Sequence, residues 1–221
     1  LRVGMLSPDF HAHAVMHFAE PLLSGLDRGQ FELWAFHMGL GEDSVTERVR
    51  SHVDSFVSLH GLNPEQQART IQAHQIDILI DLAGHTGGNG LAAMMRKPAP
   101  VQASTIGYAG TTGLTALDWW FSDGISDPPG AEPHYSERLY RLPTRWVCYR
   151  PHIRHPLRRY DPAYQVQPTP ALKNDFVTFG SSNNLGKLTD EVLTLWGRIL
   201  AAVPRSRLLI QGKGLEEANF A

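Results

Sequence analysis

The sequence predicts an α/β fold built on a doubly wound parallel sheet, and three observations support this prediction. Strand-like apolar segments alternate with segments of helical periodicity between Arg2 and Leu142. The segment Ile76–Leu82 (IDILIDL) is rich in leucine and β-branched residues, as expected for a strand buried on both faces. Polar or glycine-rich segments follow several of these strands, where an open α/β sheet places its ligand-binding loops.

The first strand–loop–helix unit begins at the amino terminus. Arg2–Leu6 is a short apolar run typical of a buried strand, and Ser7-Pro8-Asp9 predicts a turn. Apolar residues then recur at helical spacing, which predicts a helix from about His13 to Leu26. Pro21 lies inside that helix, so we expect a kink or an early end there.

The rest of this first domain continues the alternation. Further strands are predicted at Phe31–Met38, Ser55–Leu59, Ile76–Leu82, Val101–Ile106, Trp119–Ser122 and Arg138–Leu142. Helices are predicted at Glu42–His52, Pro64–Gln75 and Leu91–Met95, the second with Asn63 as its N-cap.

A change of pattern divides the chain. Residues 1–150 form the predicted first domain, and the proline-rich residues 151–174 a linker. A second α/β domain starts at residue 175, with strands at Asp175–Gly180 and Arg207–Ile210 around a helix at about Leu188–Ala202. Because a strand opens at Leu1 and the last strand lies close to residue 221, we expect a piece of a longer polypeptide.

Composition and net charge argue against several classes of function. The 221 residues are 42% hydrophobic and 19% charged, which is ordinary for a soluble globular protein. The net charge of −2 gives no electrostatic argument for binding nucleic acid or an anionic membrane. No apolar run reaches the length of a membrane span, and no signal peptide is recognisable. The single cysteine, Cys148, fits a reducing compartment, so we expect a cytoplasmic protein.

Polar loops follow three strands of the first domain. The first carries His11 and His13, and the positive end of the following helix favours a neutral imidazole that could accept a proton. Helix capping or anion binding would also explain these histidines, since helix termini attract polar residues in any case. The second loop combines Asp81 and His85 with several glycines, although Asp81 could simply cap a turn and His85 could be a surface residue. The third loop, residues 107–113, offers the hydroxyl of Tyr108.

The second domain has one candidate loop, and other site types are disfavoured. Residues 181–187 lie between a strand and a helix, where backbone N–H groups and Lys187 would suit a phosphate, unless Lys187 is only a solvated helix end. The loop matches neither GxxxxGK[ST] nor GxGxxG. Eleven histidines are present, but HExxH, Cys/His clusters and GxSxG are absent, so we expect no metal and no serine hydrolase.

Four segments carry a family resemblance: LRVGMLSPDFHAHAVMHF (1–18), DLAGHTGGNG (81–90), RKPAPVQASTIGYAGTTG (96–113) and FGSSNNLGKLTDEVLTLWGRILAAVP (179–204). In this order they resemble the O-linked N-acetylglucosamine transferase family, and its bacterial members most. The resemblance implies a GT-B fold, in which the first domain is a Rossmann-like catalytic domain and residues 175–221 begin a second Rossmann-like domain. It also implies tetratricopeptide repeats before Leu1 and a second domain that continues past Ala221.

The same resemblance implies an activity. Members of the family transfer N-acetylglucosamine from UDP-N-acetylglucosamine (UDP-GlcNAc) to serine or threonine hydroxyls of proteins. The reaction inverts the anomeric centre and needs no metal or cofactor. The partners implied are therefore protein substrates and a UDP-sugar. The residues matching the family's catalytic positions are His13 as base, Asp81 and His85 near the donor phosphates and acceptor, and Lys187 at the leaving diphosphate.

The resemblance also implies substrate-binding positions. Tyr108, Gly110 and Thr111 belong to the GYAGTTG loop, which is expected to line the sugar and acceptor side. Asn184 lies where animal relatives have a glutamine that contacts the nucleotide. Two other functions stay open: a GT-B enzyme with a small-molecule acceptor or sugar-nucleotide epimerase activity, and a non-catalytic interaction module that keeps only the fold.

Overall fold

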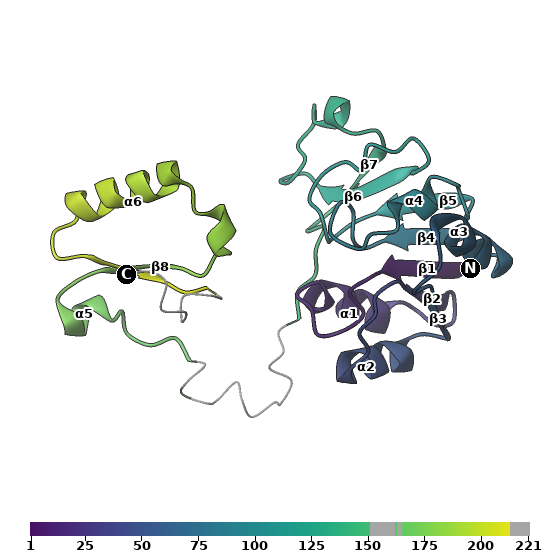
Figure 1. Ribbon diagram of the computed structural model, residues 1–221, viewed down its shortest axis with the longest axis horizontal. Helices are drawn as coiled ribbons and strands as arrows, with labels where there is room; N and C mark the ends of the chain where they lie inside the picture. The colour runs from purple at the N-terminus through teal and green to yellow at the C-terminus, as the bar shows by residue number, and fades with distance from the viewer. Residues whose placement is uncertain (151–161, 163–164, 213–221) are drawn as a thin grey trace. The chain divides into compact units, whose positions relative to one another are not determined.

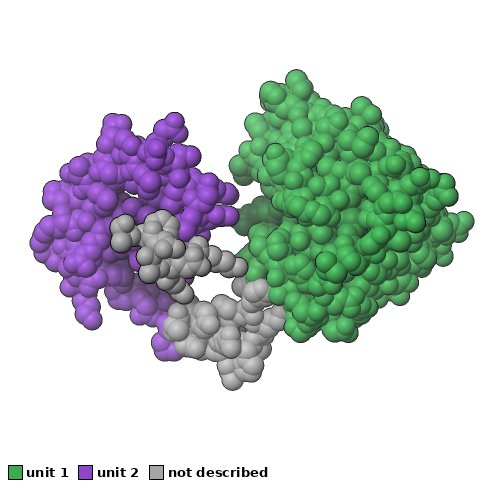
Figure 2. All heavy atoms as spheres, viewed as in Figure 1, with its two compact units in different colours: residues 1–152 green, residues 153–221 purple. Residues whose placement is uncertain are grey.

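The computed structural model describes residues 1–150, 162 and 165–212. The chain divides into two compact units, residues 1–152 and 153–221, shown in different colours in Figure 2. Most of the linker predicted at residues 151–174, and the end of the second domain from residue 213 on, lie outside the described residues.

The first unit is built on a seven-stranded parallel sheet with the order β3-β2-β1-β4-β5-β6-β7 (Figure 1). The strands are β1 (Arg2–Ser7), β2 (Glu32–His37), β3 (Ser55–Ser58), β4 (Ile78–Asp81), β5 (Val101–Ser104), β6 (Trp119–Asp123) and β7 (Arg138–Leu142). The strand order reverses between β1 and β4, and such a switch point opens a crevice at the carboxyl ends of the strands. The alternation in the sequence therefore predicted this sheet correctly.

Helices cover both faces of the sheet. They are α1 (Met16–Gly25), α2 (Ser44–His52), α3 (Pro64–Ala73), α4 (Leu91–Met94) and the short 3₁₀ turn η1 (Glu132–His134). One core cluster joins β1 and β2 to apolar residues of α1 and α2, and includes Met5, Met16 and Val49. A second cluster joins the opposite face to α3 and α4 through Ile71 and Met94. Asn63 caps α3 through a capping box, as the sequence predicted.

The first helix begins later than predicted and does not end at its proline. It begins at Met16 rather than His13, because residues 11–15 form turns whose shape is set by distant contacts. It also continues through Pro21 to Gly25, so of the two outcomes expected at this proline, a kink or an early end, the early end does not occur. A proline at this position leaves the His17 carbonyl without its usual helical donor. The backbone N–H of Arg150 donates to that carbonyl at 2.8 Å and so replaces the missing bond.

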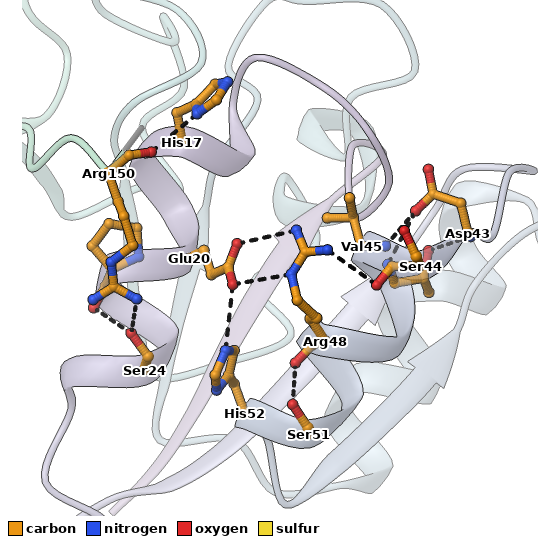
Figure 3. A network of polar contacts seen from close by, with 12 residues as sticks. His17, Glu20, Ser24, Asp43, Ser44, Val45, Arg48, Ser51, His52 and Arg150 are labelled. Carbon is orange, nitrogen blue, oxygen red and sulfur yellow. Dashed lines mark hydrogen bonds and ion pairs between the residues drawn. The ribbon is translucent and has the colours of Figure 1, made fainter. Parts of the chain in front are cut away.

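A buried acidic residue fixes α1 against α2. Glu20 of α1 is 3% exposed, and Figure 3 shows its carboxylate facing two residues of α2. Arg48 Nε lies 3.3 Å and His52 Nε2 lies 3.5 Å from Glu20 Oε1. A buried carboxylate needs such partners, because an unpaired charge in the protein interior is strongly destabilising. The network therefore fixes the position of the helix that follows the β1 loop.

The second unit contains a two-stranded parallel sheet of β8 (Thr178–Ser181) and β9 (Arg207–Ile210). Its helical elements are α5 (Ala171–Asn174), the 3₁₀ turn η4 (Leu185–Lys187) and α6 (Asp190–Ala202). The strand–loop–helix–strand pattern confirms the elements predicted here. The short α5 lies inside the predicted linker, and it ends where Asp175 adopts a left-handed conformation with φ of 57°.

Candidate functional site

The loop after β1 is held by a buried aromatic anchor and a distant carboxylate. Phe10 is fully buried, with its ring centroid 6.0 Å from His37 and 6.3 Å from Phe56. The backbone N–H of Ala12 donates to Oδ2 of Asp43, the residue that caps α2, at 2.7 Å. These contacts fix the backbone on both sides of His11, whose side chain is half-buried, and leave the side chain of His13 exposed.

His13 lies beside a carboxylate that can select its tautomer. Its Nδ1 is 3.6 Å from Asp9 Oδ2 and accepts the backbone N–H of Val15 at 3.3 Å. When Nδ1 accepts that bond, the proton of the neutral ring is on Nε2. The other tautomer, with its proton on Nδ1 facing Asp9, leaves Nε2 as the free acceptor that a general base needs, but it gives up the hydrogen bond from Val15. The His11 ring stands edge-on to His13 at 5.8 Å.

Asp81 closes β4 from a fully buried position. Its carboxylate accepts the Ser104 hydroxyl at 2.7 Å, and the backbone N–H groups of Gly84 at 2.8 Å and Ala83 at 3.2 Å. Burial raises the pKa of Asp81, and these hydrogen bonds only partly oppose the effect. In this structure the Asp81 carboxylate is buried, and its hydrogen bonds hold the start of the loop that carries His85.

The loops after β4 and β5 are in close contact. The ring centroids of His85 and Tyr108 lie 5.2 Å apart in an edge-to-face arrangement. Gly84 has φ of +56°, and a Cβ added there would lie 2.6 Å from Tyr108 Cβ. The loop after β1 reaches the same place, since a Cβ added at Gly88 would lie 3.3 Å from Pro8 Cβ. The loops after β1, β4 and β5 are therefore neighbours in the first unit.

This contact predicts different effects for two glycines of one loop. We expect Gly84→Ala to destabilise the protein by about 1–3 kcal/mol, because the added methyl group overlaps Tyr108 and the residue must keep a positive φ. Gly87→Ala is the matched control, since nothing lies within 4 Å of a Cβ there. Urea denaturation of both variants measures the difference. Equal stabilities would show that the His85–Tyr108 contact does not depend on Gly84.

The third loop is tied to a residue that the sequence analysis missed. The Thr111 hydroxyl donates to Glu137 Oε2 at 2.7 Å, and the Thr112 backbone N–H donates to Glu137 Oε1 at 2.8 Å. Gly110 lies between this anchor and Tyr108, and its N–H donates to the Tyr108 carbonyl at 3.1 Å. Glu137 directly precedes β7, and no local pattern links it to a loop 25 residues earlier.

The second unit places Asn184 and Lys187 in one turn. The Asn184 side chain accepts the Gly186 N–H at 3.0 Å and caps η4, and Lys187 is the exposed last residue of that turn. The amino terminus of α6 is less suited to an anion than the sequence suggested. Thr189 already caps α6, and two carboxylates, Asp190 and Glu191, occupy its first turn. Any diphosphate contact here depends on Lys187 and the loop backbone.

Two features are absent from the described residues. No group of three or more histidine, cysteine, aspartate or glutamate side chains in the described part of the chain could hold a metal ion. No helix within residues 1–150 and 165–212 is long and apolar enough to cross a membrane. The predicted roles of the eight site residues are not tested by these observations and stay predictions.

Comparisons with known proteins agree with the geometry. The model of the family described as glycosyl transferase family 41 matches residues 1–154. The chain is 40% identical over 217 residues to an Arabidopsis thaliana protein named "Probable UDP-N-acetylglucosamine--peptide N-acetylglucosaminyltransferase SPINDLY", covering 96% of the chain and 23% of that protein. It is 39% identical over 217 residues to the protein of the same name from Solanum lycopersicum, covering 96% of the chain and 22% of that protein.

A solved structure is similar to the chain in fold. A mutant of the Thermobaculum terrenum O-GlcNAc transferase is similar to the chain with a TM-score of 0.86 and 32% sequence identity, covering 99% of this chain and 40% of the other. The family resemblance and the GT-B-type α/β fold predicted from the sequence are thereby confirmed. The chain spans less than a quarter of the length of these curated relatives.

Proposed function

Because the chain belongs to glycosyl transferase family 41, we propose that it contributes to an enzyme that transfers N-acetylglucosamine from UDP-GlcNAc to serine or threonine hydroxyls of proteins. One observation carries the proposal: the loops bearing His13, His85 and Tyr108 are neighbours at the carboxyl ends of β1, β4 and β5. The names of the relatives, which specify a UDP-GlcNAc donor and a peptide acceptor, support it.

The chemistry follows from a single displacement. The acceptor oxygen attacks the anomeric carbon of the sugar while the bond from that carbon to the diphosphate oxygen breaks, and the configuration inverts. Nε2 of His13 takes the proton from the acceptor hydroxyl in the tautomer whose own proton is on Nδ1 and faces Asp9, and this tautomer gives up the hydrogen bond from the Val15 N–H. The departing UDP takes the electron pair of the broken bond, and the ammonium group of Lys187 stabilises its added charge. This route uses no metal and no cofactor.

The remaining site residues have supporting roles in this proposal. Tyr108 and the backbone of Gly110 line the sugar and acceptor side, next to His85. Asn184 shapes the turn that presents Lys187. The cytoplasmic location and the tetratricopeptide repeats expected from the sequence stay predictions.

Transfer to protein is tested on the natural polypeptide that carries this sequence. The polypeptide is incubated with UDP-GlcNAc, a panel of other nucleotide sugars and a protein extract, with and without a chelator. We expect N-acetylhexosamine on serine or threonine, identified by mass spectrometry, with a chelator-insensitive rate and UDP as the second product. The proposal fails if UDP forms without modified protein, which indicates a small acceptor, or if the sugar isomerises. Absence of all these products would favour an interaction module.

A further inference from the structure

Glu137 is a buried carboxylate to which the proposed mechanism gives no task. The residue is 5% exposed, and it directly precedes β7 at the edge of the sheet (Figure 1). Its two oxygens accept three hydrogen bonds from the loop at residues 107–113: from the Thr111 hydroxyl and from both the N–H and the hydroxyl of Thr112. A carboxylate in this position is a multiple anchor for one loop.

The same contacts use the full hydrogen-bonding capacity of the Thr111 hydroxyl. A hydroxyl group has one hydrogen to donate and two lone pairs. Thr111 donates its hydrogen to Glu137, and its oxygen accepts the backbone N–H groups of Gly113 at 3.0 Å and Ser136 at 3.1 Å. The oxygen thus has no lone pair or hydrogen left for a sugar or an acceptor. Thr111 is placed as a structural partner of Glu137 instead of a substrate contact.

The Thr112 hydroxyl also takes part in hydrogen bonds within the protein. It donates to Glu137 Oε1 and accepts the backbone N–H of Leu114 at 3.3 Å. Burial would by itself raise the pKa of Glu137, but hydrogen bonds from Thr112 and Thr111 outweigh burial and lower the pKa from its ordinary value of 4.5. Glu137 is therefore an ionised acceptor at neutral pH, which is the state that binds two hydroxyl donors most strongly.

A short chain of contacts leads from this anchor to the candidate site. Gly110 follows Tyr108 closely enough that a Cβ added to Gly110 would lie 3.3 Å from the Tyr108 ring. The Tyr108 ring in turn packs on His85. Ala109 also borders a cavity of about 70 Å³ lined by Trp120 and Tyr135. The Glu137 carboxylate holds the loop at the two threonines that follow Gly110.

We propose that Glu137 is a positioning residue that holds Thr111 and Thr112, and through them places Tyr108 against His85 at the substrate side of the site. The inference rests on the proposed glycosyltransferase function. It changes the expected role of Thr111 from binding substrate to fixing the loop. The groups of residues 107–113 that remain to face a substrate are then the Tyr108 side chain and the loop backbone.

A double-mutant cycle on the natural polypeptide tests this role. Glu137→Gln and Thr111→Val are each expected to lower kcat for sugar transfer by about tenfold or more, because small displacements of positioned groups have large effects on rate. The double variant is expected to lose no more than the more severe single variant, since both changes release the same contact. Thr111→Ser keeps the hydroxyl and is expected to restore turnover to near that of the natural sequence.

Glu65→Gln is the matched control, because Glu65 is an exposed carboxylate of α3 that pairs with Arg69. All rates are divided by the folded fraction, so a purely stabilising role for Glu137 would leave the corrected kcat unchanged. That result overturns the proposal, and so do multiplicative losses in the double variant. A higher KM in Thr111→Val without a lower kcat would indicate that Thr111 binds substrate. That result would also overturn the proposal.

Hydrogen exchange separates this inference from the proposed function. In Glu137→Gln, peptides covering residues 107–113 are expected to exchange faster than in Glu65→Gln, with a smaller change at residues 84–88. If the natural polypeptide transfers no sugar, the proposed function fails, and the exchange result still decides whether Glu137 holds the loop. Unchanged exchange at residues 107–113 would contradict the positioning role.

Discussion

Replacing Lys187 with alanine should lower kcat for sugar transfer by about 10²–10³-fold, the usual effect of removing one group that stabilises transition-state charge. Lys187 ends the turn η4, which Asn184 caps. The adjacent helix terminus cannot substitute for it, because Asp190 and Glu191 already occupy the first turn of α6. The cationic side chain is thus the strongest available partner for the departing diphosphate in this loop.

Steady-state kinetics on the natural polypeptide measure this effect, with circular dichroism as the check on folding. Lys173→Ala is the control, since Lys173 lies on α5 of the same unit and outside the loop. We expect the control to keep its turnover, and Lys187→Arg to keep more activity than Lys187→Ala because it retains the charge. Near-normal turnover in Lys187→Ala would remove Lys187 from the mechanism.

Replacing Asp81 with alanine should destabilise the protein by about 2–4 kcal/mol, because it leaves three buried donors without an acceptor. Those donors are the Ser104 hydroxyl and the N–H groups of Ala83 and Gly84. Turnover should fall as well, since the loop carrying His85 loses its anchor. Asp54→Ala is the control: this carboxylate also accepts a backbone N–H, from Leu33, but it is 41% exposed, and we expect a loss of about 1 kcal/mol.

The raised pKa of Asp81 can be tested through the pH dependence of the free energy of unfolding. A carboxyl group whose pKa is higher in the folded state stabilises the fold below its unfolded value of 3.8, and loses that contribution as the pH rises through the folded value. Asp81→Asn cannot ionise at this position. The free energy of unfolding of Asp81→Asn, relative to the natural sequence, should therefore improve as the pH rises from about 4 to 7. A difference independent of pH would show that the pKa is not raised.

Strands and their loops were the most predictable part of the molecule. The segment around β4 could be predicted as a strand because β4 lies in the middle of a parallel sheet with helices on both faces. Such strands have nearly continuous runs of apolar residues, which are easy to find in a sequence. The parallel topology then dictates that the loops after β1, β4 and β5 meet. The start of α1 was less predictable, because its preceding turn depends on Asp43, which lies 31 residues from Ala12.

The anchors of the candidate site were the least predictable part. Tyr108 and His85 could be found from their glycine-rich loops, but nothing in the sequence shows that their rings pack together or that Gly84 lies against Tyr108. Glu137 could not be found at all. Hydrogen bonds between a carboxylate and two distant threonines leave no periodicity or motif in a sequence, so only the folded chain brings these residues together.

The central claim, that this chain carries the donor phosphate site of a UDP-sugar transferase, is tested most directly by calorimetry. UDP is titrated into the natural polypeptide and into its Lys187→Ala and Lys173→Ala variants. We expect micromolar binding of UDP to the natural sequence and to Lys173→Ala, with a loss of at least about tenfold in Lys187→Ala. Absence of UDP binding, or equal affinity in all three proteins, would show that Lys187 does not form a donor phosphate site.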